Sequence, residues 1–202
     1  MQNFQVALLG AFADPVHLVD GLPIPLCGFS PAARCRSFKG DATYGYCAAK
    51  NQTYYGFHGH LLISLTGVIT GFTLTPANGS ERAALWDMVS TIQGLLIGDK
   101  GYLSSSLQHQ LQAVGIQLET ALRSNMNDER DPARVKLLMR VRRLVETLIG
   151  QLVERFRIEK VWARDPWHLT SRLNRKLLAH TVCRWLNRHN LTPLQLEQLV
   201  SA

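Results

Sequence analysis

Two short apolar runs in this sequence each end in an aspartate. Asp20 follows the run 16–19, and Asp99 follows the run 95–98. Short, continuous apolar runs of this kind are typical of buried strands. In an α/β sheet the carboxyl ends of the strands border the crevice in which ligands bind. The pattern therefore predicts a mixed α/β sheet with both aspartates at the edge of one crevice.

A third acid, Glu146, lies in a long amphipathic stretch. Between about 131 and 156 apolar side chains recur every three or four residues, which is typical of one helix with an apolar face. Glu146 lies at the border of that face, and Arg142 lies one turn earlier on the same border. Both side chains are therefore expected to point into a cleft between the helix and the sheet.

The rest of the pattern completes a sheet of five strands with flanking helices. Pro23 and Pro25 lack the N–H group that a strand donates, so regular pairing is expected to stop after Asp20. Residues 27–53 are expected to form a loop-rich insertion. The expected strands are 16–20, 54–65, 68–74, 95–98 and 115–122, and the expected helices are 81–91 with Ser80 as its N-cap, 104–114, 131–156, 169–187 and a short one from Pro193 onwards.

The composition is that of an ordinary globular protein. Of the 202 residues, 46% are apolar and 18% are charged, which excludes a disordered chain. No apolar run approaches the roughly 18 residues of a membrane span, and the first apolar stretch lacks the basic residues of a signal peptide. We therefore expect a cytoplasmic protein with no membrane partner. The four cysteines lack metal-binding spacing and are expected to be free thiols.

Positive charge is concentrated in the C-terminal half of the chain. Residues 123–188 contain sixteen Lys and Arg against seven Asp and Glu, whereas residues 1–122 contain six against seven. A basic region beside a cluster of carboxylates favours a polyanionic ligand, because phosphate contacts release counterions. The alternative is a helical face whose charges only meet solvent.

Together, Asp20, Asp99 and Glu146 would suit a metal site. Carboxylate oxygens are the ligands that Mg²⁺ prefers. Acids on separate rigid elements can hold two ions roughly 3.5–4 Å apart, which activate a water and stabilise the leaving oxygen in phosphodiester cleavage. Taken singly, such acids are more often solvated surface groups. Their placement at strand ends and on the border of one helix favours the metal site.

Five blocks of the sequence together form a recognisable pattern. The blocks are VDGLPIPLC at 19–27, YGFHGHL at 55–61, LTPAN at 74–78 followed by Glu81 and Arg82, GDKGY at 98–102, and RRLVE at 142–146. In order and spacing they resemble the DDE transposases of bacterial insertion sequences, and most closely the nine-eighty-two insertion-sequence family. The resemblance extends over about residues 16–186.

The resemblance implies an RNase H-like fold with Asp20 on the first strand, Asp99 after the fourth and Glu146 on a helix after the fifth. It implies that these acids are catalytic and hold two Mg²⁺ ions, for which Mn²⁺ would substitute. The implied activity is cleavage of DNA at the transposon end, followed by joining of the freed 3′ hydroxyl to target DNA. The implied partners are these DNAs and further copies of the chain in a homo-oligomeric active complex.

The chain departs from the family pattern in two places. The family usually has a lysine seven residues after the glutamate, where this chain has Val153, and it carries a helical DNA-binding region before the first strand. We expect an N-terminal remnant at 1–15, the catalytic domain at 16–160 and a basic helical extension at 161–202. A truncated copy or a separately read catalytic half is the corresponding alternative.

Further residues are candidates for contact with DNA. On the long helix two arginines are placed to meet a phosphate, and two residues just beyond Asp99 are placed likewise. A strand histidine is a weaker candidate for DNA or the metal shell, because histidines on strands are more often packed or hydrogen-bonded. These candidates are Arg142, Arg143, Lys100, Tyr102 and His60.

Trp162 and Trp167 flank Arg164, an arrangement that could stack on an unpaired base. Packing in the core is the more common role for tryptophan at such positions. The sequence leaves three functions open: a metal-dependent strand transferase, an RNase H-like nuclease that cleaves without joining, and an inactive relic that only binds DNA. A strand-joining assay on short duplex ends would separate them.

Overall fold

A computed structural model describes residues 10–35, 37–122 and 126–189. Within these residues lie six strands, five α-helices and four short 3-10 helices. The strands are β1 (Val16–Gly28), β2 (Thr43–Cys47), β3 (Gln52–Ser64), β4 (Ile69–Pro76), β5 (Gly94–Gly98) and β6 (Ile116–Thr120). The α-helices are α2 (Phe29–Ala32), α3 (Glu81–Trp86), α4 (Ser105–Ala113), α5 (Pro132–Glu154) and α6 (Pro166–His189); the 3-10 helices are η1 (Ala11–Ala13), η2 (Ala48–Lys50), η3 (Val89–Thr91) and η4 (Lys100–Tyr102).

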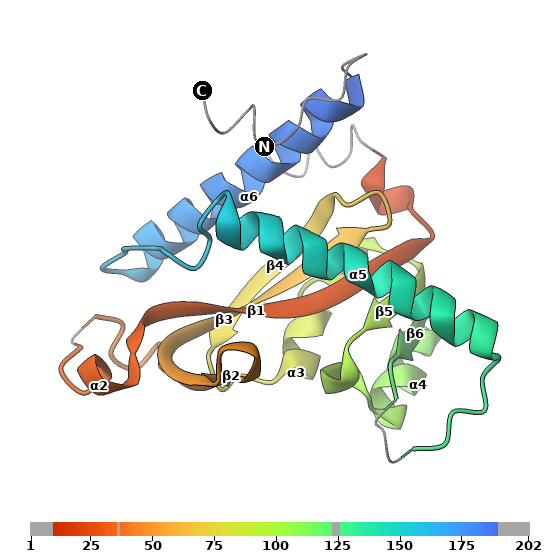
Figure 1. Ribbon diagram of the computed structural model, residues 1–202, viewed down its shortest axis with the longest axis horizontal. Coiled ribbons are helices and arrows are strands. Elements are labelled where there is room, and N and C mark those ends of the chain that lie inside the picture. The colour runs from red at the N-terminus through yellow and green to blue at the C-terminus, as the bar shows by residue number, and fades with distance from the viewer. Residues whose placement is uncertain (1–9, 36, 123–125, 190–202) are drawn as a thin grey trace.

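The strands form one mixed sheet in the order β2-β3-β1-β5-β6, and β4 also pairs with β3. β3 pairs antiparallel with β1, β2 and β4, whereas β5 pairs parallel with β1 and β6. Helices flank this sheet (Figure 1). The expected mixed α/β class is confirmed. The sheet has a sixth strand, β2, inside the segment for which we expected loops.

Successive residues of β1 point to opposite faces of the sheet, and each face has its own core. Leu18 packs in the core that includes residues of α5 and α6, and Val19 packs in the core that includes residues of α3 and α4. Figure 1 shows α5 lying across the sheet with α6 beside it. Asp20, two residues after Leu18, therefore belongs to the face that α5 covers.

The prolines of β1 do not end its pairing, contrary to our expectation. β1 stays paired with β3 through Pro23 opposite His58 and Pro25 opposite Gly56, and its register shifts only between Pro25 and Cys27. Beyond Val19 no strand pairs with the other edge of β1 in the described sheet. A proline is tolerated on a strand when its nitrogen faces such a free edge. Pro23 and Pro25 are two residues apart on the strand, so the nitrogens of both face this free edge.

The helices begin close to where the sequence places them. Ser80 caps α3 as expected, since its Oγ accepts a hydrogen bond from the Ala83 N–H, and Asp131 caps α5 in the same way through the Ala133 N–H. α3 ends at Trp86, earlier than expected, and the chain continues into η3. The expected helix from Pro193 lies outside the described residues. None of the described helices is both long and apolar enough to cross a membrane.

The close approach of β1 and β3 requires glycine at position 56. A Cβ there would overlap the Ile24 carbonyl oxygen and lie 2.9 Å from the Leu26 amide nitrogen, beside the register shift of β1. Backbone atoms cannot move aside, so Gly56→Ala is expected to destabilise the fold by more than about 2 kcal/mol. Urea unfolding would measure this change.

Gly150 is the matched control for this prediction. It lies inside α5, and a Cβ added there would have no neighbouring atom within 4 Å. Gly150→Ala is expected to stabilise the fold by about 0.5–1 kcal/mol, because alanine lowers the entropy cost of a helix interior. Equal unfolding midpoints for both variants would contradict the assignment of Gly56 as a packing glycine.

Candidate active site

The register of β1 and β5 places the two aspartates side by side. The last parallel pair of these strands is Val19 with Gly98, and Asp20 and Asp99 are the next residues on each strand. Neighbouring strands lie about 4.8 Å apart. Both carboxylates therefore extend from one point, where β5 ends and β1 continues.

Asp20 is half-buried at this point, and its Oδ1 accepts a hydrogen bond of 2.8 Å from the Gly21 N–H. Burial is the main reason why the pKa of Asp20 rises to about 6; the charges of Asp99 and Glu81 also raise it, whereas the Gly21 N–H and Arg142 lower it. Partly buried carboxylates that are crowded together are a common feature of sites that bind cations or transfer protons.

Arg142 and Glu146 reach the same point from α5. Arg142 Nη2 lies 3.0 Å from Asp99 Oδ1 and 4.0 Å from Glu146 Oε1, so the guanidinium lies between the two carboxylates. The Glu146 side chain is 57% exposed, whereas that of Arg142 is 21% exposed. Buried apolar residues of α5, among them Val145, hold the helix on the sheet. Arg142 thus lies between Glu146 and Asp99, and Glu146 does not touch the aspartates.

A fourth acid, Glu81, approaches the aspartates from α3. The charge of Asp99 adds to burial in raising the pKa of Glu81, and Glu81 Oε1 lies 4.0 Å from His58 Nε2. A Cβ on Gly101 would overlap Glu81 Oε2, so this glycine makes room for the carboxylate. Glu81 was not among the site residues predicted from the sequence. The available signal was its position directly after the Ser80 cap, inside one of the five family-like blocks.

His60 and Tyr102, which were predicted to contact DNA, are both buried in the structure. His60 is 0% exposed, and its Nε2 lies 3.0 Å from Thr75 Oγ1. Burial, with a smaller effect from His58, lowers the pKa of His60 to about 4. Tyr102 is 1% exposed and packs in the core beneath α3 and α4. Both residues were predicted as contacts because they lie in the family-like blocks. In the structure, the alternation of β3 directs His60 inwards, and the turn of η4 directs Tyr102 inwards.

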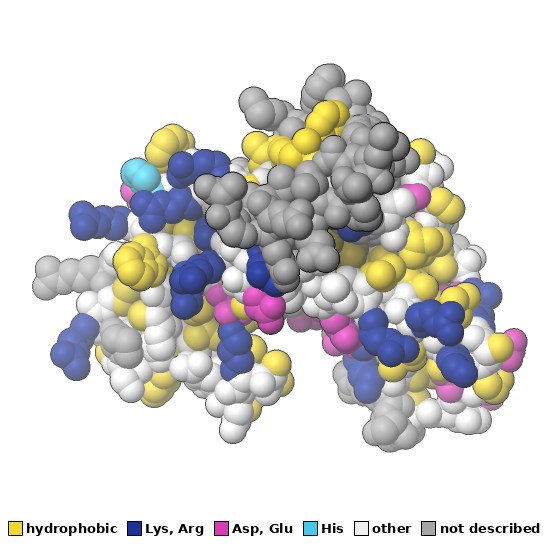
Figure 2. Space-filling model, turned by 45° about the horizontal axis from the view of Figure 1, so that its top comes forward, with side chains coloured by type: hydrophobic (Ala, Val, Ile, Leu, Met, Phe, Trp, Pro, Cys, Tyr) yellow, Lys and Arg dark blue, Asp and Glu magenta, His cyan; other side chains and the backbone are white. Residues whose placement is uncertain are grey.

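Lys100 and Arg143 are exposed, as contact with DNA requires. Further cations lie on the same helix as Arg143. Lys136, Arg140 and Arg143 are all exposed and recur at spacings of four and three residues, so they share one face of α5. Figure 2 shows acidic side chains between two groups of lysines and arginines. A polyanion that crosses this surface would meet positive charge on both sides of the acids.

The donor atoms at this point suit a hard divalent cation. Asp20, Asp99 and Glu81 offer carboxylate oxygens, which Mg²⁺ and Mn²⁺ prefer. In the described part of the chain, no three His, Cys, Asp or Glu side chains already lie close enough together to hold a metal ion. Arg142 separates Glu146 from the aspartates. The residues fit a hard cation by the chemistry of their donor atoms.

Comparison with solved structures supports the fold. The piggyBac transposase synaptic complex with hairpin DNA is similar with a TM-score of 0.56 and 10% identity, over 93% of this chain and 51% of that chain. This chain therefore spans about half the length of that transposase. The catalytic core domain of BIV integrase has a TM-score of 0.47 and 9% identity, over 93% of this chain and 94% of that one. The expected RNase H-like fold is confirmed by the first of these likenesses.

Comparison of sequences gives the family. No curated protein matches the chain significantly. Residues 11–166 match the family described as Transposase DDE domain, and this range contains Asp20, Asp99 and Glu146. The match extends over more than half of the sequence. The chain therefore belongs to the DDE transposase domain family.

Proposed function

We propose that this chain contains the catalytic centre of a transposase, which cleaves DNA at the ends of an insertion sequence and joins the freed 3′ hydroxyl to target DNA. The observation that carries the proposal is the meeting of Asp20 and Asp99 where the parallel pairing of β1 with β5 ends, next to Arg142 and Glu146 of α5. Family membership supports the same activity. The proposed partners are transposon-end DNA, target DNA and further copies of the chain.

Asp20, Asp99 and Glu146 are the proposed ligands of two divalent ions, Mg²⁺ or Mn²⁺. Such a pair of ions would activate the attacking hydroxyl and stabilise the leaving oxygen of an in-line displacement at phosphorus. Asp20 must lose its proton to act as a ligand, and a pKa of about 6 permits this at neutral pH. Glu81 is close enough to serve as an additional acceptor for water or a ligand.

Arg142 is proposed to exchange its carboxylate partner for a phosphate. It pairs with Asp99 at 3.0 Å in the structure. A guanidinium binds phosphate oxygens through parallel N–H donors as well as it binds a carboxylate. Once Asp99 serves as a metal ligand, Arg142 is free to hold a non-bridging oxygen of the scissile phosphate. Hydrolysis and strand transfer are both displacements at phosphorus, so one site can perform both.

A gel assay with labelled DNA would test this proposal. Duplexes that carry the terminal repeats flanking the coding sequence would be incubated with the chain in Mg²⁺ or Mn²⁺. We expect a nicked strand and a joined product longer than either substrate strand. Nicking without joining would indicate a nuclease instead. Stable DNA binding with neither product, in either metal, would contradict the catalytic proposal.

The basic face of α5 is expected to carry part of the DNA affinity. Replacing Lys136, Arg140 and Arg143 together by glutamine should lower the slope of log affinity against log salt on duplex DNA by about 0.9 for each lost phosphate contact. Fluorescence anisotropy across a salt series measures the slope. Arg175→Gln, an exposed change on α6, is the control. Equal slopes for the two variants would show that the α5 face is not a binding surface.

A further inference from the structure

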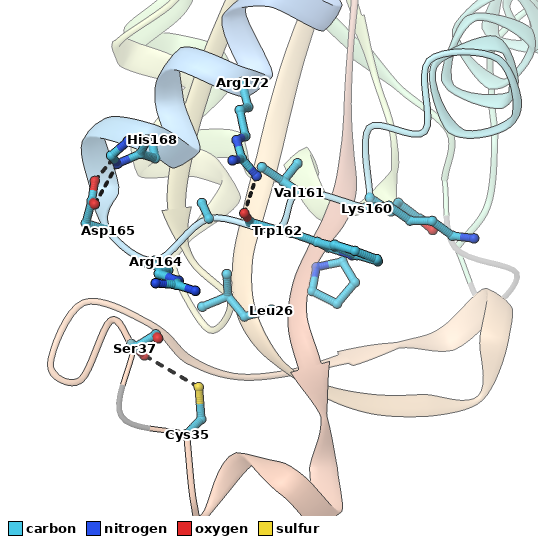
Figure 3. A pocket seen from close by; sticks show the side chains of 13 residues that line it. Leu26, Cys35, Ser37, Lys160, Val161, Trp162, Arg164, Asp165, His168 and Arg172 are labelled. Atoms are coloured by element: carbon cyan, nitrogen blue, oxygen red, sulfur yellow. Dashed lines mark hydrogen bonds and ion pairs between the residues drawn. The ribbon is translucent and has the colours of Figure 1, made fainter.

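A second hollow lies farther along β1 from the catalytic acids. A cavity of about 800 Å³ opens between Leu26 of β1, the loop that contains Cys35, and the linker between α5 and α6. Figure 3 shows Lys160, Trp162 and Arg164 of that linker, with His168 and Arg172 of α6, around Leu26. No part of the proposed catalytic centre lines this cavity. Any ligand of this cavity would therefore be held by residues other than the catalytic acids.

Trp162 is the most exposed large apolar side chain of this region. It is 86% exposed, and Trp167 at the start of α6 is 71% exposed. The expectation that these tryptophans pack in the core is therefore wrong. In Figure 3 the Trp162 side chain extends from the linker across the cavity region towards Lys160. An indole that stays in water beside a cavity is available to a flat partner such as a nucleobase.

The backbone that carries Trp162 is held in place from α6. The Arg172 guanidinium donates a hydrogen bond to the Trp162 carbonyl oxygen. A second tie lies at the beginning of the linker, where Lys176 Nζ donates to the Phe156 carbonyl oxygen at 2.6 Å and to that of Arg157 at 2.9 Å. These contacts use backbone oxygens of the linker and leave the indole ring unoccupied. The backbone from which the ring extends is thus held before any ligand arrives.

The two acids that line the cavity have partners, whereas two of its cations have no carboxylate partner. Glu159 pairs with Lys50, and Asp165 Oδ2 lies 2.6 Å from His168 Nδ1. Among the described residues, no carboxylate pairs with Lys160 or Arg164. The cavity therefore presents net positive charge together with an exposed aromatic face, a combination that favours an anionic ligand with a flat ring.

We propose that this cavity binds an unpaired nucleotide of the DNA substrate, with its base stacked on Trp162 and the backbone phosphates on either side of it held by Lys160 and Arg164. The proposal rests on the proposed function only in taking DNA as the anionic ligand. The volume lies within the range of about 300–1,000 Å³ that is usual for small-molecule sites and is ample for one nucleotide. Base stacking requires a free ring face, which paired bases inside a duplex do not offer.

The position of the cavity along β1 agrees with a single DNA molecule that meets both sites. Asp20 and Leu26 lie on the same strand, and at about 3.3 Å per residue they are separated by roughly 20 Å. That length corresponds to about six base pairs of duplex, since each strand advances by about 3.4 Å per nucleotide. A strand held at the acids could thus place a nearby unpaired nucleotide in the cavity.

Binding of a fluorescently labelled single-stranded DNA of twelve nucleotides would test the proposal by anisotropy, in EDTA so that no cleavage occurs. Trp162→Ala is expected to weaken this binding by about 5-fold to 150-fold, the range for losing one base–aromatic stack. Trp162→Phe should recover most of the affinity, because phenylalanine keeps a ring for stacking. The fold should survive both changes, since the Trp162 side chain is mostly in water. The backbone carbonyl at position 162, which accepts the hydrogen bond from Arg172, is present in both variants.

Two comparisons make the test specific for the cavity. Trp167→Ala removes an exposed indole that does not line the cavity, and it should change the affinity much less. A fully paired duplex with the same sequence should bind Trp162→Ala and the unchanged protein alike. Equal losses for Trp162→Ala and Trp167→Ala, or an equal loss on duplex and single strand, would overturn the proposal.

The phosphate part of the proposal has its own measurement. Lys160→Gln with Arg164→Gln should lower the salt slope on single-stranded DNA by about 0.7 for each lost phosphate contact. An unchanged slope would remove these cations from the site. Asp20→Asn with Asp99→Asn should keep the Trp162-dependent binding, because those acids do not line the cavity. Loss of cleavage in that variant with binding retained would therefore separate failure of the catalytic proposal from failure of this one.

Discussion

Asp99→Asn is expected to lower the rate of metal-dependent DNA cleavage by more than about 100-fold while the chain still folds and binds DNA. Loss of a residue that only supports a metal ligand commonly costs 10-fold to 100-fold, and Asp99 is proposed as a ligand itself. Asparagine keeps the shape of the side chain and removes the charge. The lost ion pair with Arg142 is partly exposed, so it should contribute little to stability.

Glu146→Gln is expected to give the same loss, and Glu154→Gln provides the matched control. Both glutamates are exposed and lie on α5, but only Glu146 borders Arg142 at the acids. Rates of nicking and joining would be measured on the same labelled duplex. If Glu146→Gln retained its activity and Glu154→Gln lost it, the third acid would have been assigned to the wrong position of the helix.

Asp20→Asn is expected to stabilise the fold above pH 6 by up to about 3 kcal/mol when no metal is present. The pKa of Asp20 is about 6 in the folded chain, against an ordinary value of 3.8. Each unit of difference corresponds to about 1.4 kcal/mol. Because the folded state binds this proton more tightly than the unfolded state, stability falls as the pH rises from about 4 to about 6 and stays lower above that. Asparagine has no proton to lose and avoids this cost.

Urea midpoints of both proteins at pH 4 and pH 7.5 in EDTA would check this expectation. The two midpoints should be similar at pH 4 and separate at pH 7.5. In a Glu81→Gln variant, the fall of the urea midpoint with pH should occur at lower pH than in the wild type, because the charge of Glu81 helps to raise the pKa of Asp20. Mg²⁺ should raise the midpoint of the wild type at pH 7.5 and leave Asp20→Asn nearly unchanged. If the wild type were more stable than Asp20→Asn at pH 7.5 in EDTA, the pKa of Asp20 would not be raised in the folded chain.

The catalytic region was accessible to sequence reasoning because its signals are local. The largely apolar runs 16–19 before Asp20 and 95–98 before Asp99 predict two buried strands, and hydrophobic periodicity predicts α5. Parallel pairing of those runs then brings the residues that follow them together. Those signals are enough to place Asp20 and Asp99 side by side and to place Glu146 on the helix that covers this face.

Other features depend on pairing and burial that the sequence does not display. The strand β2 carries exposed Tyr44 and Tyr46 and several small residues, so its apolar pattern is weak, and its pairing with β3 is what makes it a strand. The free edge of β1 explains why Pro23 is tolerated, but that edge is visible only once the sheet order is known. The approach of Glu81 to Asp20 and Asp99 likewise depends on how α3 packs on the sheet, which the sequence does not display.

Binding of Mn²⁺, measured by electron paramagnetic resonance on the free chain and on its complex with uncleavable DNA, would show whether Asp20, Asp99 and Glu146 form a metal site. We expect that the wild type binds Mn²⁺ and that Asp20→Asn, Asp99→Asn and Glu146→Gln each weaken this binding, whereas Glu154→Gln does not. The same Mn²⁺ affinity in the wild type and in all three of these variants would show that Asp20, Asp99 and Glu146 do not form a metal site.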